Sequence, residues 1–167
     1  MSKLVLSRIL ERFGPAVRSH HADCGDETAL VAAEHLVEIC RFAKEDPTLS
    51  CEMLMDLTGV DYLGLKPSAG RFEVVYHLYS LSKGHRIRLK VELPEADPKV
   101  ASVVHLWKSA LWMEREAFDL YGIHFEGHPD LRRILLYPEF EGYPLRKDYP
   151  LEKRQPLIGP RPGREHL

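Results

Sequence analysis

The chain reads FEVVYHLYSLSKGHRIRLKVEL from residue 72 to residue 93, and this stretch decides the fold. Apolar side chains stand at every second position from Phe72 to Leu78, and again from Ile87 to Leu93. Alternation with a period of two is typical of a strand that buries one face. The short turn at residues 82–84, which contains a glycine, therefore favours an antiparallel hairpin with one buried and one largely polar face.

The residues before this hairpin predict two helices and two short strands. Apolar residues recur with helical spacing over residues 3–13 and again over residues 34–44. Residues 16–21 and 28–33 have the composition of short strands around a turn. Residues 53–62 are ambiguous between helix and strand, although their end, LTGVDY, suits a strand that enters a turn.

The residues after the hairpin predict one long helix. Pro94 and Pro98 are expected to end the sheet section. Ser102 can cap a helix that runs over residues 103–121, with a break near Trp112 left open. Gly122 is placed to end this helix as a C-terminal cap.

The predicted fold class is α+β. An antiparallel β-sheet packed with helices is expected over residues 1–121, followed by an extended irregular C-terminal arm over residues 122–167. The second segment holds seven of the twelve prolines and shows little sustained periodicity. We refer to residues 122–167 as the arm.

Charge and hydropathy exclude several classes of protein. A formal charge of −2 gives no electrostatic reason to expect nucleic acid or an anionic membrane surface as a partner. No apolar run approaches the roughly twenty residues of a membrane span, so no direct membrane span is predicted. The first residues lack the features of a secretory signal, which predicts a cytoplasmic location. The three cysteines form no Cys-x-x-Cys pair, so no zinc site and no iron–sulfur ligand set is expected.

Two histidines and an acid near the start of the arm suggest a metal site. His124 and His128 are four residues apart with Glu126 between them, but Gly127 and Pro129 make a helix improbable here. A third ligand is not apparent nearby. A stand-alone metal-dependent enzyme that uses these three residues therefore remains a remote alternative.

Acidic residues of the long helix are candidates for general acid–base chemistry. Glu114 and Glu116 are not neighbours on a helix, whereas Arg115 and Asp119 form an i,i+4 pair. The pattern favours a charged helix face that docks on arginines elsewhere, and no catalytic residue is predicted.

The basic residues of the arm suggest an interface instead. A short helical turn is expected to begin at Pro129 and to carry Arg132 and Arg133, and the sequence offers few local acids for these arginines. Arginine and tyrosine on a proline-stiffened backbone are typical of interface hot spots. An arm that packs only on its own domain is the alternative. The predicted partner interface comprises Glu114, Arg115, Glu116, Asp119, Tyr121, His128, Arg132, Arg133, Tyr143, Arg146, Lys147, Asp148 and Tyr149.

Taken together, these residues resemble the signature of one family, the 30 kDa (C-type) subunit of NADH–quinone oxidoreductase, or respiratory complex I. The resemblance rests on ERE at 114–116, FDLYGI at 118–123, FEGHP at 125–129, LRRIL at 131–135, GYPLRKDYP at 142–150, LTGVDY at 57–62 and RFEVVYHL at 71–78.

The resemblance implies a non-catalytic structural subunit of the hydrophilic arm of a proton-translocating enzyme. No cofactor is expected in this chain, because FMN and the Fe–S clusters lie in partner subunits of the family. The implied partners are the large quinone-site subunit and the neighbouring Fe–S subunits, on the cytoplasmic side of the cell inner membrane. An equivalent subunit of a membrane-bound hydrogenase, or of a quinone reductase with another donor, remains the alternative.

Overall fold

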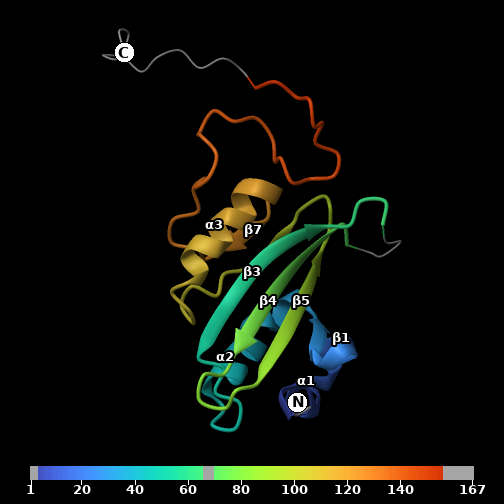
Figure 1. Ribbon diagram of the computed structural model, residues 1–167, viewed down its shortest axis with the longest axis vertical. Helices are drawn as coiled ribbons and strands as arrows, with labels where there is room; N and C mark the ends of the chain where they lie inside the picture. The colour runs from blue at the N-terminus through green and yellow to red at the C-terminus, as the bar shows by residue number, and fades with distance from the viewer. Residues whose placement is uncertain (1–3, 66–69, 156–167) are drawn as a thin grey trace.

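The computed structural model describes residues 4–65 and 70–155, and its centre is a five-stranded sheet in the order β1-β2-β5-β4-β3 (Figure 1). The strands are β1 (Val17–His21), β2 (Thr28–Val31), β3 (Met53–Asp61), β4 (Phe72–Tyr79) and β5 (Arg86–Leu93). The predicted hairpin is confirmed, because β4 and β5 pair antiparallel with Phe72 opposite Leu93. The ambiguous residues 53–62 form strand β3.

The α+β fold class is confirmed, with one difference in the sheet. β2 and β5 pair parallel, with Thr28 opposite Arg88, so the sheet is mixed and not wholly antiparallel. No tight turn joins these two strands, which lie far apart in the chain with a helix and two strands between them. Their relative direction is therefore decided by the connection and not by a hairpin, and the sequence alone gives no local signal for it.

Two helices cover one face of the sheet. They are α1 (Leu4–Phe13) and α2 (Leu36–Glu45), as predicted, and α2 lies behind the sheet in the view of Figure 1. Short 3-10 helices at η1 (Gly14–Ala16), η2 (Asp23–Gly25) and η3 (Ala33–His35) connect these elements. The buried side chains of the helices pack against the inward-facing apolar residues of β4 and β5, which is the alternation that the sequence shows.

The third helix, α3 (Ala110–Tyr121), is shorter than predicted. Residues 103–109 form turns, and the backbone N–H of Val103 donates to Oε1 of Glu114 over 2.8 Å. A continuous helix would hold residues 103 and 114 about 16 Å apart, so this bond requires the chain to fold back. Gly122 ends α3 as predicted, in the left-handed conformation with φ 72°.

α3 packs closely on β3 because of one glycine. A Cβ atom on Gly59 would lie 2.7 Å from Cδ2 of Tyr121, closer than real side chains approach. The absence of a side chain at this position therefore sets the distance between the helix and the strand.

A second, two-stranded sheet was not expected from the sequence. The main sheet ends at Leu93, as the prolines at 94 and 98 predicted, but β6 (Lys99–Ala101) and β7 (His124–Glu126) pair parallel beyond them, so the expectation of no further strand is wrong. Each strand has three residues, too few to show a period. Beyond β7, the described part of the arm forms turns and bends without a helix or strand. Across residues 4–65 and 70–155, no helix is long and apolar enough to cross a membrane.

Candidate interaction site

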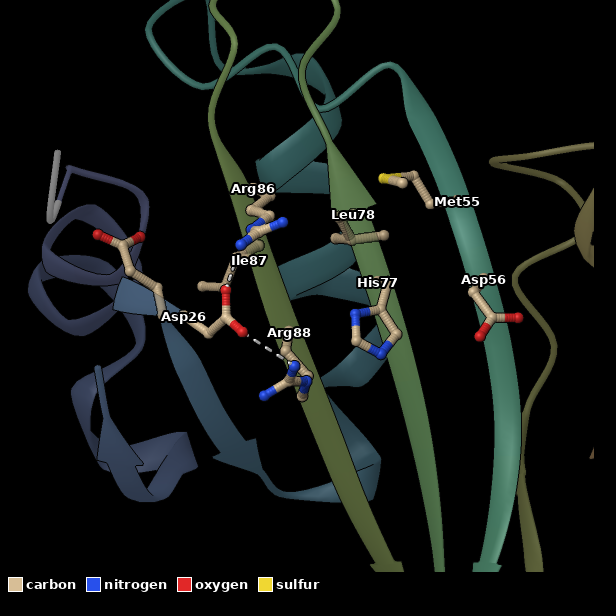
Figure 2. A pocket seen from close by; sticks show the side chains of 9 residues that line it. Asp26, Met55, Asp56, His77, Leu78, Arg86, Ile87 and Arg88 are labelled. Atoms are coloured by element: carbon tan, nitrogen blue, oxygen red, sulfur yellow. Dashed lines mark hydrogen bonds and ion pairs between the residues drawn. The ribbon is translucent and has the colours of Figure 1, made fainter. Parts of the chain in front are cut away.

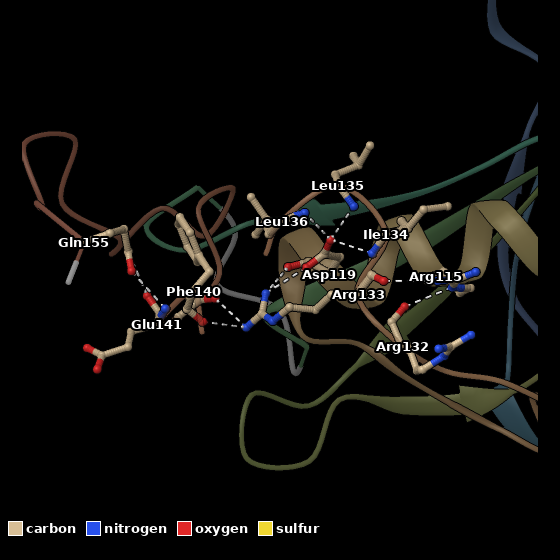
Figure 3. A network of polar contacts seen from close by, with 11 residues as sticks. Arg115, Asp119, Arg132, Arg133, Ile134, Leu135, Leu136, Phe140, Glu141 and Gln155 are labelled. Atoms are coloured by element: carbon tan, nitrogen blue, oxygen red, sulfur yellow. Dashed lines mark hydrogen bonds and ion pairs between the residues drawn. The ribbon is translucent and has the colours of Figure 1, made fainter. Parts of the chain in front are cut away.

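The carboxylate of Asp119, in the last turn of α3, holds the arm by its backbone (Figure 3). Oδ2 accepts the backbone N–H groups of Ile134, Leu135 and Leu136 at 3.0, 2.8 and 2.9 Å. Oδ1 accepts Nη1 of Arg133 at 2.7 Å. Burial acts to raise the pKa of Asp119, but the backbone donors and the Arg133 guanidinium outweigh it and hold the pKa below its ordinary value.

These contacts explain why the predicted helical turn at Pro129 is wrong. The N–H groups of residues 134–136 donate to a side chain and not to carbonyls of their own segment. The structure has bends here. A buried carboxylate that accepts several charge-assisted bonds competes successfully with a single helical turn.

Arg115 holds the arm from the other side. Its guanidinium donates to the carbonyls of Arg132 and Arg133 at 3.0 and 3.1 Å, and it lies over the ring of Trp112 at 5.3 Å. Arg115 and Asp119, predicted as an i,i+4 pair, thus both hydrogen-bond to the arm. The expectation that this charged helix face docks on an arginine elsewhere is confirmed by the Asp119–Arg133 ion pair.

Two arginines of the arm, Arg132 and Arg133, do have acids within the chain, contrary to the expectation from the sequence. Arg132 is exposed and pairs with Asp130 at 2.6 Å, while Arg133 pairs with Asp119. Nη2 of Arg133 also donates to the carbonyls of Phe140 and Gly142, each at 3.2 Å. For Arg132 and Arg133 the shortage of acids that motivated a contact to another protein is therefore absent, and the interface role of the basic residues of the arm stays a prediction.

Arg146 is held in the same way. Its Nε donates to the carbonyl of Tyr121 at 2.7 Å, and its guanidinium lies 4.9 Å from the ring of Phe72 and 4.5 Å from that of Tyr143. A Cβ on Gly122 would come within 2.6 Å of Arg146 and Tyr143, so this glycine is needed for space as well as for its φ.

A series of cation–ring contacts, with one ring–ring step, links the arm between Arg133 and Lys153 to the start of β4. Arg133 lies over Tyr143 and Phe140 at 5.4 and 5.9 Å, and Phe140 stacks on Tyr149 at 6.1 Å. Each such cation–ring contact contributes about 0.5–1 kcal/mol at an exposed site and more where water is excluded. We call the series the cation–aromatic ladder; in order, its members are Arg71, Phe72, Arg146, Tyr143, Arg133, Phe140, Tyr149 and Lys153.

Arg71 joins the arm to the sheet, a role that was not expected from the sequence. Its guanidinium forms a two-bond pair with buried Asp61 at 3.0 and 2.8 Å, and it reaches Asp148 at 2.6 Å and Glu95 at 2.7 Å. The backbone N–H of Lys147 donates to the same Asp61 at 2.8 Å. Burial would raise the pKa of Asp61, but Arg71 and the backbone donors lower it to about 2.

Other predicted interface residues face inward. Glu114 is fully buried, and this burial raises its pKa to about 7 even though Ser102 and the N–H of Val103 bond to it. His128 is half-buried, contacts the carbonyl of Leu111 through Nε2 at 3.1 Å and accepts the N–H of Asp130. The exposed members of the predicted set are Glu116, Arg132, Lys147 and Asp148.

The metal-site candidates are not brought together. His124 and Glu126 lie exposed on β7, while His128 is bound to the backbone. Among the residues that the structure describes, no group of three or more His, Cys, Asp or Glu could hold a metal ion. Burial raises the pKa of the Cys40 thiol, and that of Cys51 to about 12, so neither is a reactive thiolate.

A cavity of about 280 Å³ opens on the uncovered face of β3, β4 and β5 (Figure 2). Its two arginines, Arg86 and Arg88, pair with Asp26 at 2.6 and 3.5 Å. Burial, followed by the charge of Arg88, lowers the pKa of His77, which lies beside them. These cations already have a partner, and the lining residues offer no nucleophile with an adjacent base.

Comparison with protein families places this chain in one of them. The model for the respiratory-chain NADH dehydrogenase 30 Kd subunit matches residues 29–155. The NADH-quinone oxidoreductase C 2 subunit of Rhizobium meliloti is 48% identical over 155 residues, which cover 93% of this chain and 83% of that protein. The corresponding NADH-quinone oxidoreductase subunit of Geobacter sulfurreducens is 45% identical over 153 residues, covering 92% and 88%.

Two solved structures have a similar fold. A trypsin-resistant fragment (1-134) of Nqo5 aligns with a TM-score of 0.68 and 36% identity over 77% of this chain and all of the fragment. A chain from the membrane-bound sulfane sulfur reductase, an archaeal respiratory membrane complex, aligns with a TM-score of 0.71 and 26% identity, covering 89% and 85%.

Proposed function

This chain belongs to the family of the 30 Kd subunit of respiratory-chain NADH dehydrogenase, and from that premise we propose that it is a non-catalytic structural subunit of a proton-translocating NADH–quinone oxidoreductase. The observation that carries the proposal is the 48% identity to a named NADH-quinone oxidoreductase subunit over 93% of the chain. The arm lies largely inside the matched residues 29–155. Its partners are other subunits of that enzyme.

Electron transfer from NADH to quinone would take place in the partner subunits. FMN and the Fe–S clusters belong to those subunits in the proposal, and this chain supplies a folded surface beside them. The polar groups of the candidate site support a structural role, because Arg115, Asp119 and Arg133 are engaged in holding the arm. Such contacts position a segment and offer no group for chemistry.

The specific partner in the proposal is the large quinone-site subunit, with the neighbouring Fe–S subunits around it. The assembly would lie on the cytoplasmic side of the cell inner membrane as the peripheral arm of the enzyme. The two relatives support the quinone as acceptor, since both are subunits of NADH-quinone oxidoreductases.

A complex with another electron donor is the second candidate. The similarity to a chain of the sulfane sulfur reductase shows that the fold also occurs in a respiratory membrane complex of another name. That chain is 26% identical, however, against 48% and 45% for the two NADH-quinone oxidoreductase subunits. The higher identities favour NADH as the donor of the complex that contains this chain.

Deletion of this chain from its host tests the proposal. NADH-dependent quinone reduction by isolated membranes is expected to fall to background and to return when the tagged chain is restored. Quinone reduction with succinate is the control and should not change. A tagged chain should also bring down the flavin and Fe–S subunits from solubilised membranes. Undiminished NADH–quinone activity in the deletion strain would contradict the proposal.

A further inference from the structure

We propose that Glu114 is a proton-binding site that controls the attachment of residues 103–109 to the rest of the fold: the protonated carboxyl keeps this segment closed, and loss of the proton to water lets it open. We refer to residues 103–109, which lie between β6 and α3, as the bridging segment. The inference concerns this chain alone and does not depend on the complex that contains it.

The bridging segment is attached to both the sheet and α2. Nε1 of Trp107 donates to the carbonyl of Glu52, beside the edge strand β3, at 3.0 Å. Nζ of Lys44, in α2, donates to the carbonyl of Leu106. The Trp107 side chain is buried in the core. Opening of the segment would therefore break these contacts and let water reach Glu114 and the Trp107 ring.

The Glu114 carboxyl is fully buried and is hydrogen-bonded from one side. Its Oε1 accepts the backbone N–H of Val103 at 2.8 Å. Across the part of the chain that the structure describes, Oε2 has no hydrogen-bond partner. A neutral carboxyl is tolerated in such a place, whereas a carboxylate would leave a charged oxygen out of reach of water. The closed segment is thus suited to the protonated form.

The groups that face Glu114 are neutral. Tyr76 of β4 and Cys40 of α2 are its titratable neighbours in the core, and burial, with a smaller contribution from Glu114, raises the pKa of both. Arg115, the next residue of α3, directs its guanidinium to carbonyls of the arm. Within the described residues, the groups that act to lower the pKa of Glu114 are the Ser102 hydroxyl and the backbone N–H of the bridging segment, and none of them is a cation.

The direction of the pH dependence follows from the burial of Glu114. Burial raises its pKa to about 7, from an ordinary value of 4.5. Opening admits water and returns the pKa towards the ordinary value, so the open state binds the proton less tightly. The stabilisation of the closed state is fully present below about pH 4.5 and is lost as the pH rises through about 7. The ratio of open to closed segment should therefore rise at least about tenfold between about pH 5 and pH 8.

Hydrogen exchange of the purified full chain tests this site. The amides of Leu106 and Trp107 both donate to the carbonyl of Val103, and their protection should fall at least about tenfold between about pH 5 and pH 8, after correction for intrinsic exchange. Glu114→Gln has no proton to lose there, so protection in this variant should stay constant to within about twofold. Glu116→Gln, at an exposed acid on the same helix, is the matched control and should keep the pH dependence of the unaltered chain.

Urea distinguishes local opening from unfolding of the whole chain. Below the unfolding transition, exchange in the bridging segment should hardly change with urea, whereas exchange in β4 and β5 should accelerate. Equal protection and equal urea dependence in the two regions overturn the inference, because Glu114 would then act only on global stability. Protection of the segment that does not change with pH in the unaltered chain overturns it too, and so does a pH dependence that persists in Glu114→Gln.

The infrared spectrum of the unaltered chain covers the case in which Glu114→Gln does not fold. The C=O stretch of a protonated carboxylic acid should be present at about pH 6 and should disappear with a midpoint near pH 7. The loss of protection in the bridging segment should level off at the pH at which this band disappears. A spectrum without the band at about pH 6, or a clear mismatch between the two pH values, overturns the inference.

Discussion

Asp148, near the end of the described arm, lies 2.6 Å from Nη2 of Arg71, 77 residues earlier at the start of β4. Arg71 in turn binds the buried carboxylate of Asp61, which also accepts the N–H of Lys147. One guanidinium and one carboxylate thus fasten both the backbone and a side chain of the arm to the sheet. The arm is attached here and again at Asp119.

Removal of Asp119 should release the middle of the arm. Asp119→Ala leaves three backbone N–H groups and the Arg133 guanidinium without their acceptor, and the free energy of unfolding is expected to fall by about 3 kcal/mol. Urea unfolding of the purified chain gives this value, and hydrogen exchange of the amides of residues 134–136 should accelerate. Glu116→Ala, an exposed acid on the same helix, is the control and should change neither quantity. Unaltered exchange at residues 134–136 would show that Asp119 does not hold them.

The guanidinium at position 133 should not be replaceable by an ammonium. Arg133→Lys keeps the charge but loses the fork that reaches two carbonyls and the planar contacts with Phe140 and Tyr143, at an expected loss of about 1–2 kcal/mol. Arg132→Lys, at the adjacent exposed arginine, should cost less than about 0.5 kcal/mol. Equal losses of unfolding free energy in urea would contradict the role of the rings.

The pKa of Glu114 predicts a fall in stability towards alkaline pH. Its pKa is about 7 in the folded chain, above the ordinary value of about 4.5, so the folded state binds the proton more tightly. The free energy of unfolding should therefore decrease as pH rises from about 4.5 to about 7 and stay lower above that. Glu114→Gln removes the charge while keeping an oxygen for the N–H of Val103.

The free energy of unfolding of Glu114→Gln should exceed that of the unaltered chain by about 2 kcal/mol at pH 8 and by little at pH 5. Urea unfolding at the two pH values measures the difference. Parallel pH profiles of the two proteins would show that Glu114 does not carry this effect.

The low pKa of Asp61 predicts the opposite behaviour in acid. A pKa of about 2 in the folded chain, below the ordinary value of about 3.8, means that the unfolded state binds the proton more tightly. The stabilisation is present above about pH 4 and is lost as pH falls towards about 2. Asp61→Asn should lose about 2 kcal/mol at pH 6 and should unfold with a weaker dependence on pH between about 4 and 2. If the free energy of unfolding of Asp61→Asn depended on pH between about 4 and 2 as that of the unaltered chain does, groups other than Asp61 would cause the loss of stability in acid.

Local patterns in the sequence predicted much of the domain. The hairpin follows from strict alternation on either side of a glycine-containing turn, and the helices that became α1 and α2 follow from apolar spacing. β6 and β7 could not be found in this way, because three residues show no period. The late start of α3 depends on a bond between Val103 and Glu114, which no local preference encodes.

The residue types of the candidate site could be predicted from the sequence, but the partners of their side chains could not. The residues between 114 and 150 indicate that many charges and rings must find partners. Whether those partners lie in the same chain depends on pairs far apart in sequence, such as Arg71 with Asp148. The role of Arg71 could have been suspected from its place beside Phe72 in the family motif, but only the fold brings it to the arm.

The cation–aromatic ladder also predicts which part of the arm loses its structure first on heating. Its inner members are fixed to α3 and the sheet, whereas Lys153 touches one ring at the outer end. Because Lys153 is the outermost member, thermal fraying should begin there and travel inward until it meets Asp148, which is paired with Arg71. Amino-acid changes near the tip would then be tolerated, and the same changes near the base would loosen everything beyond them.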